Sequence, residues 1–291
     1  MRMPHAPVCE QVDEQWVGNF RRWMQARTDR ERSPSTIENS VLQLAAAINF
    51  AASPGRRDTI RGALFKPQPV VELNRSPTHR SDIKELARMF AYASDPRFPV
   101  KRKWLWNFLV ASVATLARPD AVLDISTDPD RRQWISNARV LNLNHHGRRQ
   151  TKKYRATVPI SYQVAPWFDR TEGFFIPVQS IRSAWDSMAV DLKLPNDGQS
   201  GSKLIRRSMA KLLRDRLRKD DWIELEMFLG HAKFDATSDI YAPFDPNYLS
   251  AARKEIEAII DEIEALVPGA FHRTDSGEVA NITPIAAARS A

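Results

Sequence analysis

The chain of 291 residues contains a single cysteine, Cys9, and no long apolar run. One cysteine excludes a disulfide framework and a cysteine-based zinc site within one chain, and it fits a reducing compartment. The longest apolar stretch, residues 104–117, is interrupted by polar side chains and falls short of the about 18 residues that a membrane helix needs. The N-terminal segment lacks the apolar centre of a secretory signal. We therefore expect a soluble, cytoplasmic (nucleoid-associated) protein with no membrane partner.

Sequence motifs for metal and nucleotide chemistry are also missing. The chain has no GxxxxGK[ST] loop for nucleotide phosphates and no HExxH motif for zinc, and no carboxylate cluster suits magnesium. His145 and His146 are adjacent, and neighbouring residues on a strand point to opposite faces, so they make a poor metal pair. We expect no cofactor, no metal and no ATP.

Basic residues are in excess. Lys and Arg number 43 against 35 Asp and Glu, which gives a formal net charge of +8. This surplus favours an anionic partner, and nucleic acid is the commonest one. Charge alone does not identify that partner.

Helical periodicity dominates the sequence, and strand alternation is confined to about residues 132–160. There Leu141 and Leu143, and later Ala156 and Val158, alternate with polar residues on either side of Gly147. The pattern predicts a mainly α fold with a small antiparallel β-sheet. The expected helices cover residues 11–27, 37–53, 82–92, 101–117, 180–193, 202–218, 221–230 and 247–266.

Composition divides the chain into four parts. Residues 8–65 predict a small helical unit with many arginines. Residues 66–77 are rich in proline and are interpreted as an interdomain linker. Residues 78–267 carry the other helices and the strands. Residues 268–291 lack apolar periodicity, so we expect them to form a disordered tail.

Residues able to carry chemistry are spread over the third part. Lys203 and Arg206 share a face of a helix crowded with basic residues, which is either a solvated face or a phosphate-binding helix. Arg118 follows a helix just before a proline, where an arginine caps carbonyls or points into a cleft. His231 follows a glycine suited to a helix C-terminus, and Tyr241 comes ten residues later. A lone histidine or tyrosine is usually structural, and the basic helix face and Arg118 are each open to a structural interpretation.

Taken in order, these residues resemble the tyrosine recombinase and phage integrase family. The matching stretches are LARPDAVLDI, GRRQTKKYRATVPI, KLIRRSMAKLL and LGHAKFDATSDIYAPFDPNYL, within about residues 80–262. The stretch RSPSTIENSVLQLAAAINFA more loosely resembles the family's helical core-binding domain. The resemblance implies an N-terminal core-binding domain, which binds DNA, followed by an α+β catalytic domain.

The resemblance also implies roles for individual residues. Arg118 and Arg206 would clamp the scissile phosphate, and Tyr241 would attack it. The implied catalytic set is Tyr241, Arg118, Arg206, His231, Lys152 and Lys203. Further DNA contacts are expected from Lys153, Arg207, Lys211 and Arg149. His231 would assist proton transfer, and Lys152 would protonate the leaving 5′ oxygen.

The implied reaction breaks and rejoins DNA through a 3′-phosphotyrosyl link. Two arginine forks can hold the non-bridging oxygens bidentately at any working pH. The covalent link stores the bond energy, so rejoining needs neither ATP nor a metal. The expected partners are double-stranded DNA sites, further copies of the chain in a tetrameric synapse, and an accessory DNA-bending protein.

Several alternatives stay open at this stage. Lys203 stands where the family usually has histidine, and the spacing from His231 to Tyr241 is one residue longer than the family's pattern. Lys153 competes with Lys152 as the hairpin lysine. A non-cutting DNA-binding protein on the same scaffold, or a helix-turn-helix regulator built on residues 202–218 and 221–230, would also be basic. Tyr248 is a rival nucleophile that we expect to pack. We expect the apolar stripe of residues 247–266 to dock on a neighbouring protomer.

Overall fold

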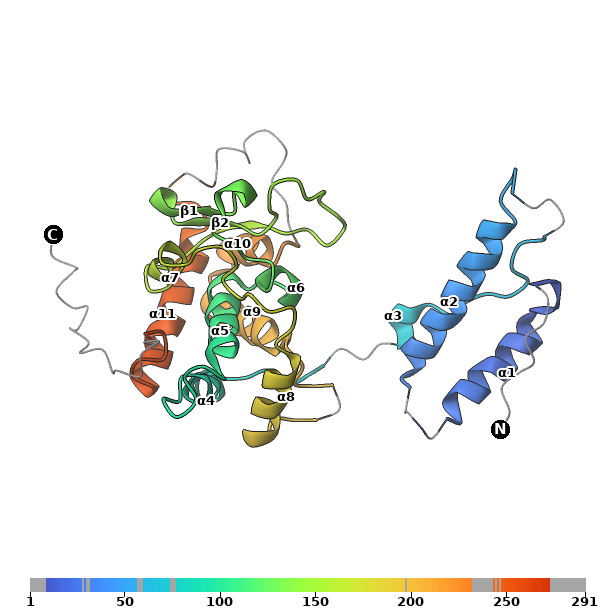
Figure 1. Cartoon of the computed structure of the whole chain (residues 1–291), viewed down its shortest axis with the longest axis horizontal. Helices are drawn as coiled ribbons and strands as arrows, with labels where there is room; N and C mark the ends of the chain where they lie inside the picture. The colour runs from blue at the N-terminus through green and yellow to red at the C-terminus, as the bar shows by residue number, and fades with distance from the viewer. Residues whose placement is uncertain are drawn as a thin grey trace. The chain divides into compact units, whose positions relative to one another are not determined.

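The structure is a computed structural model that describes residues 9–27, 29, 32–56, 60–73, 77–196, 198–231, 243, 245 and 247–272. The chain divides into two compact units, Met1–Pro77 (unit 1) and Thr78–Ala291 (unit 2). Figure 1 shows both units, with the helices and the strands β1 and β2 labelled. Each unit is described by itself.

Unit 1 is built on two helices, α1 (Glu14–Gln25) and α2 (Pro34–Ala51). Both helices start at side-chain caps, because Asp13 accepts a hydrogen bond from the Trp16 N–H and Ser33 accepts one from the Thr36 N–H. The helices pack on each other through a small apolar core of Val12, Val17, Val41, Ala45, Ile48 and Phe65. A short 3-10 turn, Cys9–Gln11, precedes α1.

The segment expected to be a linker is partly folded into unit 1. Val70–Leu73 form a short helix, α3, which packs on α2. The backbone N–H of Lys66 donates to Glu14, and that of Gln68 donates to Glu38. Carboxylates of both long helices therefore hold the start of this proline-rich stretch, and its residues Val70–Leu73 are helical.

Unit 2 combines helices with a three-stranded sheet. Its helices are α4 (Ile83–Ala93), α5 (Lys103–Thr115), α6 (Pro119–Val122), α7 (Ala165–Asp169), α8 (Arg182–Asp191), α9 (Leu204–Arg216), α10 (Trp222–Phe228) and α11 (Ser250–Leu266). Its strands are β1 (Trp134–Ile135), β2 (Val140–Asn142) and β3 (Thr157–Pro159), antiparallel in the order β1-β2-β3. Leu141 pairs with Trp134 on one side and with Val158 on the other. The predicted mainly α fold with a small antiparallel sheet is confirmed.

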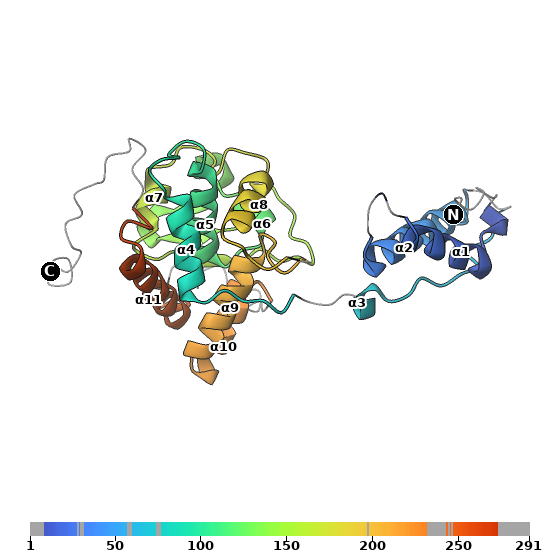
Figure 2. The ribbon, with the colours of Figure 1, turned by 90° about the horizontal axis from the view of Figure 1, so that it is seen from below.

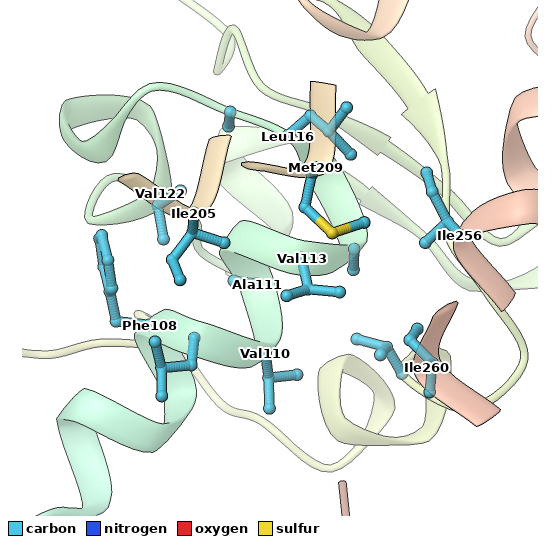
Figure 3. Close-up of a cluster of buried hydrophobic side chains, with 14 of the residues drawn as sticks. Phe108, Val110, Ala111, Val113, Leu116, Val122, Ile205, Met209, Ile256 and Ile260 are labelled. Atoms are coloured by element: carbon cyan, nitrogen blue, oxygen red, sulfur yellow. The ribbon is translucent and has the colours of Figure 1, made fainter. Parts of the chain in front are cut away.

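Helix α5 is the centre of unit 2. Every residue from Leu105 to Thr115 is buried, as expected for a helix that is apolar all round. Figure 3 shows Phe108 and Val113 of α5 among apolar side chains of α9 and α11, such as Met209 and Ile260. In Figure 2, α4 lies beside α5, and α11 packs against α4 as well. None of the helices in the described ranges combines the length and apolarity needed to traverse a bilayer.

The apolar stripe of α11 is used inside unit 2. Ile256, Ile260 and Ile263 are at most 1% exposed, and α11 packs against α4, α5 and α9. The expectation that this stripe docks on a neighbouring protomer is therefore wrong. Just before α11, the Tyr248 hydroxyl donates to the Thr157 carbonyl at 3.0 Å, and Tyr248 packs against the core as predicted.

The predicted tail begins too early at residue 268. Ala270 and Phe271 are fully buried, and the Phe271 ring lies 4.4 Å from that of Phe90. The indole N–H of Trp106 donates to the Ala270 carbonyl at 2.6 Å. These contacts come from distant parts of the sequence, so the local pattern could not indicate them. Unit 2 is folded at least to residue 272.

Candidate active site

Arg118 lies at the junction of α5 and α6. Leu116 ends α5 in the left-handed conformation, with φ of 52°, and Pro119 begins α6. A residue before proline is pushed out of the helical region, and Arg118 is accordingly extended, with φ of −67° and ψ of 149°. The Arg118 Nη1 donates to the Tyr154 carbonyl at 3.0 Å. The chain thus turns Arg118 out of the buried helix toward the segment before β3.

Arg206, in the first turn of α9, is anchored by backbone carbonyls from two distant segments. Its Nη1 donates to the Leu116 carbonyl at 2.5 Å, and its Nη2 donates to the Leu229 carbonyl at 2.6 Å. Burial, and then the positive charge of Arg118, lower the pKa of Arg206 to about 10. Arg206 is therefore still cationic at neutral pH, but the fold holds that charge against desolvation and like-charge repulsion.

Gly230 and His231 end α10 in a Schellman motif. The Gly230 N–H donates to the Met227 carbonyl at 2.9 Å, and the His231 N–H donates to the Glu226 carbonyl at 2.8 Å. Gly230 has φ of +62°, the conformation that this motif requires at that position. The motif brings the His231 ring to Arg206.

The contacts of His231 assign its tautomer. Its Nε2 lies 3.3 Å from Arg206 Nη2, and its Nδ1 lies 3.0 Å from a Glu226 carboxylate oxygen. A guanidinium can only donate, so Nε2 accepts and Nδ1–H donates to the carboxylate. Glu226 therefore orients the ring, and Nε2 is the nitrogen that faces Arg206.

The β2–β3 hairpin completes a cleft beside Arg118, Arg206 and Gly230. The cleft is lined by Arg118, Lys153, Tyr154, Arg155, Arg206 and Gly230, among others. Lys152 and Lys153 are both exposed, but Lys153 lines the cleft and Lys152 does not. Segments from three parts of unit 2 thus bring two arginines and a hairpin lysine together.

The other predicted site residues lie elsewhere. Lys203 is exposed at the N-cap of α9, and Arg149 is exposed in the hairpin. Arg207 donates to the Gln199 carbonyl and does not line the cleft. Lys211 is exposed and forms an ion pair with Asp215 at 2.5 Å. Tyr241 lies outside the described residues.

Sequence reasoning missed three acidic residues and one arginine beside the cleft. Asp120 and Asp124 both form ion pairs with Arg155, which is 9% exposed, and Glu226 contacts His231. Only their nearness in sequence to the motif residues could have indicated them. Where the chain is described, no three His, Cys, Asp or Glu residues gather to hold a metal ion. His145 and His146 follow β2, so the argument from opposite strand faces does not apply to them.

Gly230 allows a close approach that alanine would block. A Cβ on Gly230 would lie 2.7 Å from the Tyr154 carbonyl oxygen, whereas a Cβ on Gly173, with φ of +76°, would meet nothing within 4 Å. Gly173→Ala should lower the free energy of unfolding by about 1–2 kcal/mol, the cost of the left-handed conformation. Gly230→Ala should lower it further, because the hairpin must also move. Urea unfolding measures both variants, and equal losses would contradict the close approach.

The paired arginines predict an oxyanion site. An anion between Arg118 and Arg206 would relieve the repulsion and desolvation that lower the pKa of Arg206. At a pH below about 10 Arg206 is charged, so burial and repulsion by Arg118 lower the stability of the folded chain by their full amount. The stabilisation by a bound anion should therefore be seen at neutral pH. Inorganic phosphate at ten times its Kd should raise Tm by about 3–5 °C, which corresponds to about 1.4 kcal/mol.

Calorimetry in phosphate, against chloride of equal ionic strength, measures this shift. Arg118→Gln should remove the shift, and Arg182→Gln should keep it, because Arg182 is exposed on α8 and does not line the cleft. A shift of equal size in Arg118→Gln would mean that phosphate binds elsewhere.

Comparisons with known proteins place the fold. No family model matches the chain, and no curated protein matches its sequence. Among solved structures, that of the Tn1549 transposon integrase in complex with transposon right end DNA is similar to this chain, with a TM-score of 0.51. The similarity covers 88% of this chain and 88% of that chain, at 13% sequence identity.

The chain has the fold of this integrase. The expected architecture, a small antiparallel sheet among helices, is therefore confirmed. At 13% identity the likeness to the integrase concerns the fold alone. The chemistry of the cleft has to be argued from its own residues.

Proposed function

We propose that this chain is a site-specific DNA recombinase or integrase that cuts and rejoins DNA through a 3′-phosphotyrosyl intermediate. One observation carries the proposal: Arg118 and Arg206, far apart in sequence, line one cleft together with the hairpin lysine Lys153. Its fold is that of an integrase solved with transposon end DNA, which adds support for DNA as the substrate.

The cationic donors that line the cleft suit a phosphodiester. Arginine forks match the geometry of phosphate oxygens, and buried guanidiniums stay charged at neutral pH. Arg206 has five N–H donors, and its contacts with Leu116, Leu229 and His231 leave donors for a ligand. The backbone anchors fix this guanidinium before DNA arrives, so little reorganisation is needed when charge develops on the phosphate.

The proposed step exchanges one ester for another. The Tyr241 phenolic oxygen attacks the phosphorus, and the bond from phosphorus to the 5′ oxygen breaks. His231 Nε2 accepts the phenolic proton on its lone pair, which releases the N–H of Arg206 that it accepts in this structure. A hairpin lysine gives a proton to the 5′ oxygen, and the position of Lys153 in the cleft favours it over Lys152. The reverse step rejoins a strand, with no cofactor required.

A covalent adduct tests the proposal directly. Binding sites are first selected from a random pool of DNA duplexes, and nicked suicide versions of these sites are then incubated with the protein. A nick lets the short 5′-hydroxyl fragment diffuse away and traps the intermediate. A protein–DNA adduct on a denaturing gel is the expected result. Bound DNA without any adduct would overturn the proposed chemistry.

The second candidate is a DNA-binding protein on the same scaffold that does not cut. Lys203 favours it, because this exposed lysine stands where the resembled family usually has histidine. Lysine, with a reference pKa of about 10.4, is a poor base near neutral pH. A helix-turn-helix built on α9 and α10 would leave Arg118 and the hairpin lysine in the cleft without a role. Tetramer assembly on DNA and an accessory bending protein stay predictions.

A further inference from the structure

The hairpin that carries the two lysines has little strand pairing of its own. β2 and β3 contribute three residues each, and the last ladder bond, from the Leu143 N–H to the Ala156 carbonyl, measures 3.0 Å. Residues 144–155 continue beyond that bond without strand structure. Strand pairing therefore does not explain why Lys153 lies in the cleft.

Side chains hold the hairpin at its base. The Gln150 amide bridges the loop, because its Nε2 donates to the Arg155 carbonyl at 2.8 Å and its Oε1 accepts from the Arg155 N–H at 3.2 Å. Lys152 and Lys153 lie inside the short loop that this amide closes. Arg118 donates to the carbonyl of Tyr154, the residue between Lys153 and Arg155.

Arg155 is the anchor of this base. Its Nη1 donates to a carboxylate oxygen of Asp124, and its Nη2 lies 3.4 Å from a carboxylate oxygen of Asp120. The Arg155 side chain is 9% exposed. Asp124 is held in turn by Arg131 at 2.5 Å. Asp120 lies in α6 and Asp124 lies just after it, so the short segment 118–124 carries Arg118 and both carboxylates that bind Arg155.

The charges make this an unusual anchor for a cleft that binds an anion. Two carboxylates beside the cleft oppose a phosphate, and an apolar base could support the hairpin without them. A guanidinium that bridges two carboxylates fixes both the position and the orientation of its side chain, because its hydrogen bonds are directional. Apolar packing is less directional. The arrangement is suited to orienting the neighbouring lysine.

We propose that Arg155, held by Asp120 and Asp124, is a positioning residue that sets the hairpin lysine against the scissile phosphate. The inference rests on the proposed function and deepens it. Because Arg118 and Asp120 belong to the same short segment, the position of the hairpin lysine depends on the position of Arg118. Lysine at position 155 would keep the charge but not the fork, so it should lose this orientation.

A leaving group that needs no proton separates positioning from general damage. In a suicide substrate with sulfur in place of the bridging 5′ oxygen, a thiolate leaves, and its pKa of about 8.5 makes protonation unnecessary near neutral pH. Arg155→Lys should slow adduct formation on ordinary DNA by about 10–100-fold, because a general acid contributes about 100-fold or more. On the sulfur substrate the slowing should nearly vanish. Equal slowing on both substrates would overturn the inference.

A second measurement does not depend on cleavage. Hydrogen–deuterium exchange of peptides covering residues 144–156 should be faster in Arg155→Lys than in the wild-type chain, with and without bound DNA. Unchanged exchange would overturn the inference even if cutting is impaired. If the wild-type chain forms no adduct, the proposed function fails, and the exchange result still decides whether Arg155 positions the hairpin.

Arg216→Lys is the matched control. Arg216 lies on α9 and forms a two-pronged ion pair with Glu262, at 2.7 and 2.9 Å, and it does not line the cleft. Its replacement removes a comparable fork without touching the hairpin. It should leave adduct formation on both substrates and exchange over residues 144–156 unchanged. If Arg155→Lys does not fold, Asp124→Asn, which keeps size and removes charge, takes its place.

Discussion

Tyr241→Phe should abolish the covalent protein–DNA adduct while leaving DNA affinity unchanged. Phenylalanine keeps the ring but lacks the oxygen that would bond to phosphorus, so the proposed intermediate cannot form. The phosphate would still meet Arg118 and Arg206, because neither depends on the phenol in the contacts described. Denaturing gels measure the adduct, and a filter-binding titration of the same DNA measures the affinity.

Tyr248→Phe is the matched control for this experiment. The Tyr248 hydroxyl donates to the Thr157 carbonyl at 3.0 Å, so its loss should cost about 1 kcal/mol of stability, a typical net value for one hydrogen bond. The adduct should persist. An adduct that survives in Tyr241→Phe and disappears in Tyr248→Phe would show that the nucleophile has been assigned to the wrong residue.

Much of the helical framework could be predicted because its signals are local. The basic helix expected over 202–218 is α9, and the apolar helix expected over 101–117 is α5. Asp82 caps α4 by accepting from the Glu85 N–H, and Pro119 opens α6, as their residue types indicate. A cap, a proline or an apolar stripe acts within a few residues, so the sequence alone reveals it.

The parts that could not be predicted depend on contacts across long stretches of chain. Nothing local to Arg206 indicates that the carbonyls of Leu116 and Leu229 hold its guanidinium. Phe271 lies in a stretch without apolar periodicity, and its ring packs on that of Phe90. The two residues lie near opposite ends of unit 2 in the sequence. The apolar stripe of α11 is compatible with a protein–protein interface or with a place in the core. Only its packing against α4, α5 and α9 shows that it belongs to the core.

The candidate site divides in the same way. Residue types and their order sufficed to bring Arg118, Arg206 and His231 under consideration, and the structure gathers them at one place. The order could not distinguish Lys152 from Lys153, because hairpin geometry depends on the ion pairs of Arg155. The acidic supports of the site stayed hidden, since a carboxylate near a phosphate cleft has no simple sequence signal.

Arg206→Lys tests the element of the site that the structure defines most fully. Lysine retains the positive charge, but its compact ammonium lacks the planar fork that reaches both carbonyls and a phosphate from separate nitrogens. We expect adduct formation to slow by roughly 100–1,000-fold, the typical effect of removing one preorganised donor. We also expect the free energy of unfolding to fall by about 1.5–3 kcal/mol, because the Leu116 and Leu229 carbonyls lose charged donors.

Arg216→Lys, on the same helix, is again the control, because its ion pair with Glu262 lies outside the cleft. It should leave cleavage unchanged and alter stability by less than about 1 kcal/mol, as for an exposed ion pair. Single-turnover gels and urea unfolding measure the two effects. The hydrogen bonds to the carbonyls contribute to stability, and the contact with the phosphate contributes to cleavage. Phosphate binds the folded site, so it should stabilise Arg206→Lys less than it stabilises the wild-type chain. Wild-type cleavage in Arg206→Lys would mean that Arg206 supports the fold and takes no part in holding the phosphate.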